Sequence, residues 1–390
     1  MADGTGLNSD TSSVWLSRND GTVEALSELC ARETRQEDCP NASEIAQNVP
    51  IYDAAHFEGM YDANRRGLMA EWARIFLSGP GVVVIRDAIP NVAAIDRATA
   101  LFSDIIVEER NVSAKGDYFA APGANDRVWN SLQKHCLADA ENFADYFSFP
   151  AIDMACRAWL GPGYQVTGQV HRVNPGGMAQ HAHRDYHLGF MTPERQEDYP
   201  SHVQRLSPML TLQGAIAHID MPVESGPTLY LPYSQAFLEG YLAFERDAFQ
   251  DYFFANCSQL PMRKGDAVFF NPAVMHGAGT NTTKDLLRMV NLLQVSSPMG
   301  RTMEAIDRTE MAKHLYPTLL DGRWTRAACA RIVAACAEGY AFPTNLDTDP
   351  AVGGMSPKTQ ADLMNEALAN RTPVDDFLSL MDTLEARRQP

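Results

Sequence analysis

The chain has 390 residues, of which 45% are hydrophobic and 21% are charged, and its formal net charge is −17. This length is ample for a buried core, and the composition is typical of a globular protein. An acidic surface repels nucleic-acid phosphates and anionic lipid, so we expect no nucleic-acid partner and no membrane partner.

The seven cysteines include no CxxC pair, which predicts free thiols in a reducing compartment. The sequence contains no run of eighteen apolar residues, so we expect no membrane-spanning helix. The first residues lack the basic and apolar regions of a signal peptide. We therefore expect a cytoplasmic protein.

The first part of the chain alternates between polar and helical segments. Residues 1–50 are polar and acidic, which predicts a loosely ordered N-terminal arm with one helix near 23–35. The β-branched run 82–85 predicts a buried strand that follows a Gly-Pro-Gly turn. Apolar residues at helical spacing predict helices over 66–78, 93–109 and, with breaks, 132–160.

From residue 165 the pattern changes to short strands separated by Pro, Gly and Asn. Strands are predicted over 165–173, 209–219, 228–231, 267–271 and 287–296. This pattern is typical of an antiparallel barrel or jelly roll. We expect one domain over 51–300, in which the β core carries N-terminal helices. A helical extension over 301–390 would pack on that core, or form a lid or a dimer contact.

Histidines cluster in the segment Gln180-His-Ala-His-Arg-Asp-Tyr-His187. In a strand, residues i and i+2 point to the same face, so His183 and Asp185 could bind one ion while Arg184 points away. His181 is also two residues from His183, but only His183 is followed by a carboxylate at i+2. An isolated HxD tripeptide is a weak signal, because it also occurs by chance.

A second segment, about ninety residues later, supplies further candidates. His276 precedes a glycine-rich turn and is the candidate third ligand. Two histidines and a carboxylate suit Fe(II), because they leave coordination positions for O2 and a cosubstrate. Arg288 lies in an otherwise apolar run, where it predicts a two-pronged bond to a carboxylate such as that of 2-oxoglutarate. Alternatively, Arg288 lies in solvent at a strand end or pairs with an Asp or Glu of the chain.

Four segments in order resemble the phytanoyl-CoA dioxygenase family of Fe(II)/2-oxoglutarate-dependent oxygenases, over roughly residues 75–300. They are a first strand and turn (81–90), the HxD segment (183–187), a Gly-Pro…Pro-Tyr-Ser segment (224–235) and a distal histidine and arginine segment (264–288). Each segment alone is weak, but four in order at suitable spacing are a strong signal.

The resemblance implies a mainly β protein with flanking α-helices and a double-stranded β-helix (jelly-roll, cupin-like) core. It implies that His183, Asp185 and His276 hold Fe(II) and form the catalytic centre. Arg288 would anchor 2-oxoglutarate, and O2 would be the second cosubstrate. Related halogenases replace the carboxylate with a small residue, so the presence of Asp185 favours hydroxylation or another oxidation such as desaturation.

The resemblance also implies roles for residues around the centre. Gln180 occupies a place where some relatives put a polar residue near the cosubstrate, and Gln213 a strand position where some carry an aromatic against 2-oxoglutarate. Four further residues are candidates for lining the substrate pocket: His171, Arg127, Trp129 and Asn130.

We therefore expect a hydroxylase that acts on an unactivated C–H bond of a small organic substrate and releases succinate and CO2. The substrate could be an amino acid, a carboxylic acid, a secondary metabolite or an acyl-CoA. The acidic chain favours the smaller molecules, because an acyl-CoA needs a basic groove. Two alternatives stay open: a cupin-type metal enzyme that does not use 2-oxoglutarate, and a non-catalytic binding protein on the same scaffold. The C-terminal helices also make a homodimer plausible.

Overall fold

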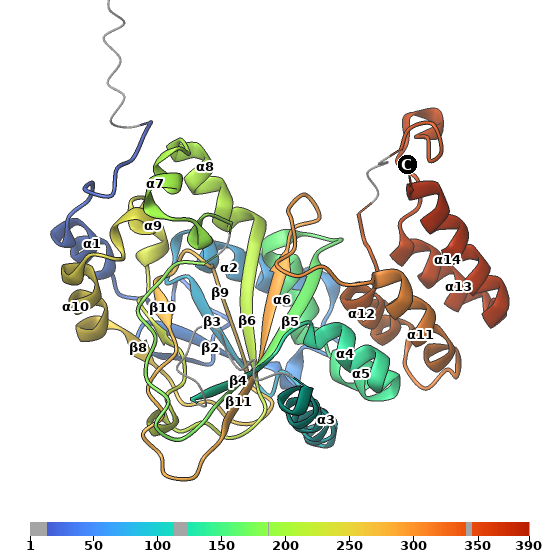
Figure 1. Ribbon diagram of the computed structural model, residues 1–390, viewed down its shortest axis with the longest axis horizontal. Coiled ribbons are helices and arrows are strands. Elements are labelled where there is room, and N and C mark those ends of the chain that lie inside the picture. Colours follow the sequence, from blue (N-terminus) through green and yellow to red (C-terminus); the bar gives the residue numbers. More distant parts are fainter. Residues whose placement is uncertain (1–13, 113–123, 186, 341–344, 390) are drawn as a thin grey trace, which may run out of the picture.

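The computed structural model describes residues 14–112, 124–185, 187–340 and 345–389. Its centre is a mixed eight-stranded sheet, accompanied by a smaller three-stranded sheet (Figure 1). The strand order is β1-β2-β3-β9-β6-β11-β5-β4 in the large sheet and β10-β7-β8 in the small one. Among the described strand pairs only β2 and β3 run parallel. The expected β core with flanking helices is thereby confirmed.

The large sheet consists of β1 (Glu44–Ala46), β2 (Val49–Asp53), β3 (Val82–Arg86), β4 (Asn125–Val128), β5 (Gln165–Val173), β6 (Thr211–Ala217), β9 (Ala267–Phe270) and β11 (Arg288–Ser296). The small sheet consists of β7 (Leu229–Tyr230), β8 (Ser258–Gln259) and β10 (His276–Gly277).

Alternate side chains of the central strand β11 face a cavity on one side of the large sheet and the main core on the other. It pairs with β5 along its whole length and with β6 over seven residues. Side chains alternate along a strand, so Arg288 and Gln294 line a cavity while Leu293 and Val295 are fully buried in the main core. The sequence pattern of β11 thus decides which polar side chains reach the cavity.

Helices cover the core side of the large sheet, and their apolar residues belong to one core cluster with it. These helices are α2 (Asp62–Ser78), α3 (Val92–Val112), α4 (Ser131–Ala138), α5 (Ala140–Phe147), α6 (Pro150–Leu160), α11 (Arg308–Leu320), α12 (Arg326–Cys336), α13 (Gln360–Asn370) and α14 (Val374–Arg388). The fully buried Trp72 of α2 and Phe102 of α3 are among the largest side chains of this core.

A second set of helices lies outside this core cluster. It comprises α1 (Val23–Cys30), α7 (Pro193–Glu197), α8 (Ser201–Leu206), α9 (Gly240–Ala243) and α10 (Asp247–Asn256). Apolar residues of α1, α9 and α10 form a separate core cluster with Leu229 of β7. Ala182 and Met275 belong to the same cluster and are fully buried. They directly precede His183 and His276, so this packing anchors the two segments that carry the candidate ligands.

Residues 14–50 lie against the core where the structure describes them. The predicted helix near 23–35 begins at Val23, capped by the Thr22 side chain, but ends at Cys30. Thr34 then bonds to Asn48 through its backbone N–H and its hydroxyl group, which turns the chain. Strands β1 and β2 follow as the edge of the large sheet. The expectation of loose order therefore does not hold for residues 44–50, and the domain boundaries at 50 and 300 stay predictions.

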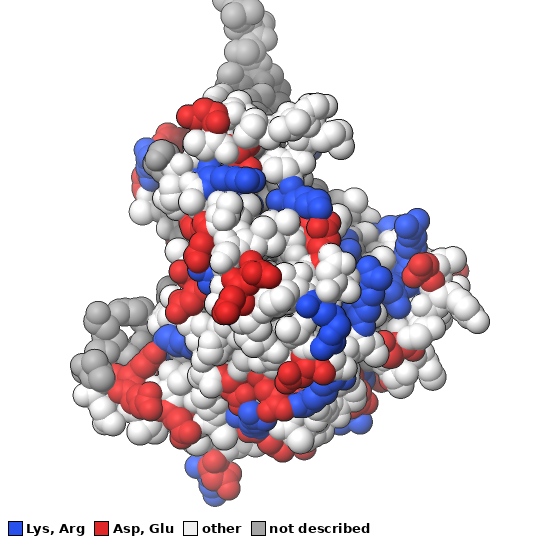
Figure 2. All heavy atoms as spheres, turned by 90° about the vertical axis from the view of Figure 1, so that its right-hand side faces the viewer, with Lys and Arg blue, Asp and Glu red and all other residues white. Residues whose placement is uncertain are grey.

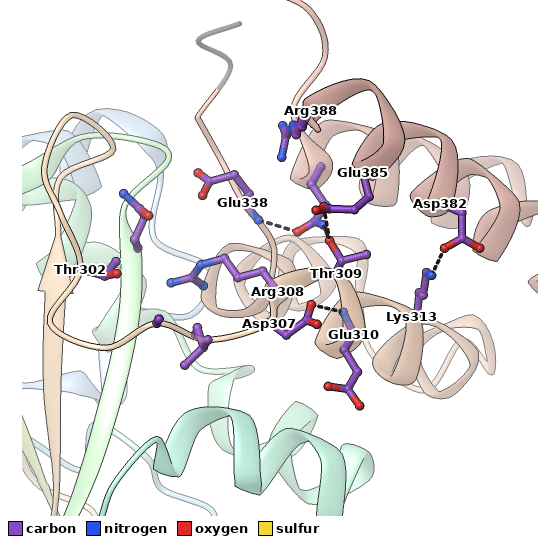
Figure 3. A pocket seen from close by; sticks show the side chains of 14 residues that line it. Thr302, Asp307, Arg308, Thr309, Glu310, Lys313, Glu338, Asp382, Glu385 and Arg388 are labelled. Carbon is purple, nitrogen blue, oxygen red and sulfur yellow. Dashed lines mark hydrogen bonds and ion pairs between the residues drawn. The ribbon is translucent and has the colours of Figure 1, made fainter. Parts of the chain in front are cut away.

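The C-terminal segment attaches to the core through a buried arginine. Arg308 extends from the start of α11 toward the strands and is 8% exposed (Figure 3). Its guanidinium group donates to the carbonyl oxygens of Val166 on β5, at 2.7 Å, and Cys336 on α12, at 3.3 Å. Gln360 of α13 adds a bridge, because its amide accepts from the Glu338 backbone and donates to Thr309. A polar cavity of about 630 Å³ is lined in part by Arg308, Thr309, Glu338 and Gln360.

The face that α11 to α14 present to solvent carries both acidic and basic side chains, in small groups of each sign (Figure 2). Several of them pair, such as Lys313 with Asp382 and Lys358 with Glu366. Exposed pairs of this kind add little stability, but they prevent a field of a single sign on this face. No helix in the described part of the chain is long and apolar enough to cross a bilayer.

We predict that Arg308→Met destabilises the protein by about 1–3 kcal/mol, because it removes charged donors from two buried carbonyl groups. The free energy of unfolding from urea titration measures the effect. Arg387→Met is the matched control, because Arg387 is exposed on α14, and its change should stay within about 0.5 kcal/mol. Equal stability of the two variants would contradict the attachment through Arg308.

Candidate metal centre

Two segments far apart in the sequence meet through their backbones at His183 and His276. The N–H of His183 donates to the carbonyl of His276 at 3.0 Å, and the N–H of His276 donates back at 3.1 Å. This is an isolated antiparallel bridge outside the named strands. The sequence predicted a strand at His183, and the structure gives the extended geometry of a strand at a single bridge. The register of this bridge sets both imidazoles on one side.

Three potential ligand atoms converge there. The ligand atoms of His183, Asp185 and His276 all lie within 4.8 Å of one another. Asp185 places Oδ1 at 3.8 Å from Nε2 of His183 and Oδ2 at 3.6 Å from Nε2 of His276. The three residues that the sequence selected as a metal triad are thus brought together. A cluster of two imidazoles and one carboxylate has the composition of a non-haem Fe(II) site.

Each imidazole is held in the tautomer that a metal ligand needs. The Nδ1 of His183 lies 2.9 Å from the carbonyl oxygen of His181, and that of His276 lies 2.7 Å from the carbonyl oxygen of Val274. A carbonyl oxygen can only accept, so each Nδ1 carries the hydrogen and donates. The lone pair of each Nε2 then faces Asp185 and is available to a metal.

The protonation states of the triad also fit a metal. Burial lowers the pKa of His183, an effect that the charge of Asp185 partly opposes. Burial alone would raise the pKa of Asp185, but His183, His276 and a hydrogen bond from Gln213 together hold it well below its usual range. Neutral His183 and ionised Asp185 are the forms that coordinate cations near neutral pH.

Arg184 points away from the triad, as the spacing of the HxD segment predicts. It is 2% exposed, donates to the carbonyl oxygen of Ser234, and lies over the ring of Tyr241 at 5.5 Å. The Tyr241 hydroxyl group donates to the carbonyl oxygen of Asp185 at 2.8 Å. Gly240 packs against the guanidinium group so closely that a Cβ atom there would overlap it. These contacts fix the backbone between the two ligands.

The triad faces a cavity of about 900 Å³ that also contains Arg288. Arg288 is 3% exposed, and burial lowers its pKa to about 10. Its Nη1 donates to the carbonyl oxygens of Ser225 and Gly279, both at 3.3 Å. No acidic side chain pairs with it among the described residues. Arg288 therefore lies neither in solvent nor against an acid of the described chain, which were the two alternatives to binding a carboxylate.

The remaining predicted residues divide into those that line this cavity and one that does not. The lining includes Gln180, Gln213, His171, Arg127 and Trp129. Asn130 lies outside that lining: it precedes α4 in a left-handed conformation, and its backbone N–H donates to Glu304. Its predicted role in the substrate pocket is the one that the geometry does not support.

Local contacts hold several lining residues in place. The side-chain oxygen of Gln180 accepts from the N–H of Ala278 at 3.1 Å, which ties it to the segment after His276. Arg127 donates to the Oε1 of Gln169 at 2.8 Å and lies over the ring of Trp129 at 5.1 Å.

Sequence reasoning missed other lining residues, notably Gln169 and Gln294. The period-two rule could have found Gln294, because it lies six residues after Arg288 and therefore on the same face of β11. The same rule puts Gln169 on the face of His171. No sequence signal identified the apolar lining residues Met178, Phe190 and Met303.

The family model for phytanoyl-CoA dioxygenase (PhyH) matches residues 78–290, which is more than half of the chain and spans the triad and Arg288. The chain belongs to this family. It is thus an enzyme of the Fe(II)/2-oxoglutarate-dependent oxygenase type, whose cofactor is Fe(II) and whose cosubstrates are 2-oxoglutarate and O2.

Solved structures with a similar fold include the non-haem α-ketoglutarate-dependent carbocyclase SnoK from nogalamycin biosynthesis, at 18% identity and a TM-score of 0.42, covering 62% of this chain and 85% of that one. The epimerase SnoN of the same biosynthesis has 17% identity and a TM-score of 0.41, over 61% and 82%. HygX from Streptomyces hygroscopicus, with nickel, 2-oxoglutarate and hygromycin B bound, has 14% identity and a TM-score of 0.40, over 61% and 90%. No curated protein matches the sequence.

We predict that Gly240→Ala destabilises the protein by about 1–3 kcal/mol, because the added Cβ displaces the buried Arg184. Urea unfolding of the metal-free protein measures the change. Gly67→Ala is the control: Gly67 lies in α2 with open space around it, so alanine there should be neutral or stabilise by up to about 1 kcal/mol. A Gly240→Ala protein as stable as wild type would show that Arg184 adapts freely.

Proposed function

We propose that this protein is an Fe(II)/2-oxoglutarate-dependent dioxygenase that hydroxylates an unactivated C–H bond of a small organic substrate, with release of succinate and CO2. His183, Asp185 and His276 hold the metal, and Arg288 anchors 2-oxoglutarate. One observation carries the proposal: a buried arginine without an acidic partner in the described chain shares a cavity with a preorganised His-Asp-His triad.

The triad supports the metal part of this proposal. Its two imidazoles present Nε2, and its carboxylate is ionised, without any rearrangement of the chain. Three protein ligands leave coordination positions for a bidentate keto acid and O2. Bound Fe(II) supplies the oxidising chemistry together with these cosubstrates. The protein residues supply the geometry and exclude water.

Arg288 supports the cosubstrate part. A buried guanidinium group is unfavourable without an anion, and its fork matches a carboxylate in a two-pronged bond. The neighbouring cavity wall includes Met221, Met262, Val268 and Phe270, which are apolar and buried. An ion pair is stronger in such a dry environment than in water. The distal carboxylate of 2-oxoglutarate provides the anion that this position requires.

The rest of the cavity supports a small organic substrate. Its total volume of about 900 Å³ is within the range of small-molecule sites, which is roughly 300–1,000 Å³. Polar side chains from β4 and β5, namely Arg127, Gln169 and His171, lie near the apolar Trp129 and Met303. This mixture suits an amino acid, a carboxylic acid or a secondary metabolite with both polar and apolar parts. The retained Asp185 favours hydroxylation.

The two alternatives from the sequence account for fewer of these features. A cupin-type metal enzyme that does not use 2-oxoglutarate explains the triad but gives Arg288 no function. A non-catalytic binding protein needs neither an ionised Asp185 nor imidazoles fixed in one tautomer.

Succinate release tests the proposal. Anaerobically purified protein receives Fe(II), ascorbate and 2-oxoglutarate and is then exposed to O2, with Asp185→Ala as the control. Succinate from wild type alone supports the proposal. If neither protein forms succinate, the anaerobic absorbance of the Fe(II)·2-oxoglutarate complex decides, because such enzymes can idle without substrate. If that absorbance is also absent, the proposal is wrong.

We predict that His183→Ala, Asp185→Ala and His276→Ala each abolish succinate formation, because each removes one of three metal ligands. Anaerobic Fe(II) titration should show a parallel loss of binding. His202→Ala is the control: His202 is exposed on α8 and should leave both properties unchanged. A variant of the triad that binds Fe(II) as tightly as wild type would remove its residue from the assignment.

We predict that Arg288→Met raises the KM for 2-oxoglutarate by about 10- to 100-fold, because hydrogen bonds to charged groups contribute about 1.5–3 kcal/mol. Fe(II) affinity should change little, because Arg288 is not part of the triad. Arg205→Met, at an exposed position on α8, is the control. An unchanged KM would favour the enzyme class that does not use 2-oxoglutarate.

A further inference from the structure

Gln213 lies on β6 in the wall of the cavity, beside the metal triad. It is 3% exposed, and Gln294 is its partner across the sheet on β11. Its Nε2 donates to Oδ2 of Asp185 at 2.6 Å and to Oε1 of Gln294 at 3.1 Å. One amide group therefore joins a candidate metal ligand to a second amide in the cavity wall.

The orientation of the Gln213 amide is determined by Asp185. An ionised carboxylate only accepts hydrogen bonds, so the group that faces it must be the NH2 group. The reversed amide would set its oxygen against the carboxylate oxygen. In the observed orientation, the Oε1 of Gln213 is buried and has no hydrogen-bond partner within the described chain. A buried acceptor without a donor is unfavourable. The hydrogen bond from Nε2 to Asp185 therefore stabilises this orientation by more than the unpaired Oε1 of Gln213 costs.

Other contacts of Asp185 hold its backbone rather than its carboxylate. Its N–H donates to the carbonyl oxygen of Pro272 at 3.1 Å, and its carbonyl oxygen accepts from Tyr241 at 2.8 Å. The carboxylate needs a separate restraint, because its terminal torsion is soft. Gln213 supplies this restraint, and it also occupies a lone pair of Oδ2.

We propose that Gln213 is a positioning residue of the metal centre: its amide holds the Asp185 carboxylate in the orientation that binds Fe(II). Gln294 assists by accepting from the same NH2 group. This inference rests on the proposed function, because it takes Asp185 as a metal ligand. It differs from the role against 2-oxoglutarate that the sequence suggested for Gln213. Groups that orient metal ligands typically change metal affinity or activity by about 10- to 100-fold when they are removed.

The test is anaerobic Fe(II) titration of Gln213→Met against a competing chelator. Methionine keeps the length and burial of the side chain but cannot donate. We expect Fe(II) affinity to fall by about 10- to 100-fold. At saturating Fe(II), the KM for 2-oxoglutarate should stay within about threefold of wild type, because the change acts on Asp185 and leaves Arg288 in place. Arg288→Met should give the opposite pattern.

Gln360→Met is the matched control. Gln360 is a buried glutamine on α13 that bonds to Glu338 and Thr309 and does not line the metal cavity. The same chemical change there should leave Fe(II) affinity unchanged. Thermal melting of the metal-free proteins shows whether each variant is folded.

Gln213→Leu provides a second variant, which also serves if Gln213→Met does not fold. Leucine fills the same buried position and cannot donate a hydrogen bond, so Fe(II) binding should weaken about as much as in Gln213→Met. A folded Gln213 variant that binds Fe(II) as tightly as wild type overturns this inference. The same holds if the KM for 2-oxoglutarate rises while Fe(II) affinity stays constant. Wild-type protein that binds no Fe(II) overturns the proposed function instead.

Discussion

Two backbone hydrogen bonds between His183 and His276 are the constraint on which the candidate centre depends. They join two segments about ninety residues apart and fix which faces of both segments meet. A shift of one residue in this register would turn one imidazole to the opposite side. The preceding residues, Ala182 and Met275, are fully buried in the core around the small sheet. Apolar packing of Ala182 and Met275 thus stabilises the register that brings the imidazoles of His183 and His276 together.

The two buried arginines near this bridge illustrate how a structural cation differs from a binding cation. Burial lowers the pKa of both Arg184 and Arg288 to about 10. Arg184 is surrounded by a carbonyl group, an aromatic face and the backbone at Gly240, so the protein fills its environment. Arg288 has two long bonds to carbonyl oxygens and faces a cavity. Neither arginine pairs with an acid in the described part of the chain, but of the two only Arg288 lines a cavity that an anionic ligand could enter.

Much of the fold could be predicted from local periodicity, which also sets His183 and Asp185 on one face, whereas His276 was assigned to the triad through the resemblance to the family. The strand over 165–173 was predicted with its observed bounds, and β11 to within one residue. What could not be predicted depends on contacts between distant segments. Gln213 was placed correctly on a strand, but its bond to Asp185 joins residues 28 positions apart and depends on the tertiary fold. Asn130 was selected because the resemblance puts part of the family's substrate pocket in its segment, yet it lies in the turn before α4, outside the cavity lining.

The side chains along β11 make the two ends of the cavity chemically different. Arg288 and Gln294 are six residues apart on one face, which is roughly 20 Å along an extended strand. One end is cationic and largely apolar in its surroundings, whereas the other carries the neutral amides of Gln294 and Gln213 beside the ionised Asp185. A dicarboxylate is attracted to the first end and repelled by a free carboxylate at the second. On the proposed function, the triad would hold Fe(II), whose charge would offset that repulsion, and 2-oxoglutarate would direct its keto acid toward the triad and leave the β4 and β5 side to the substrate.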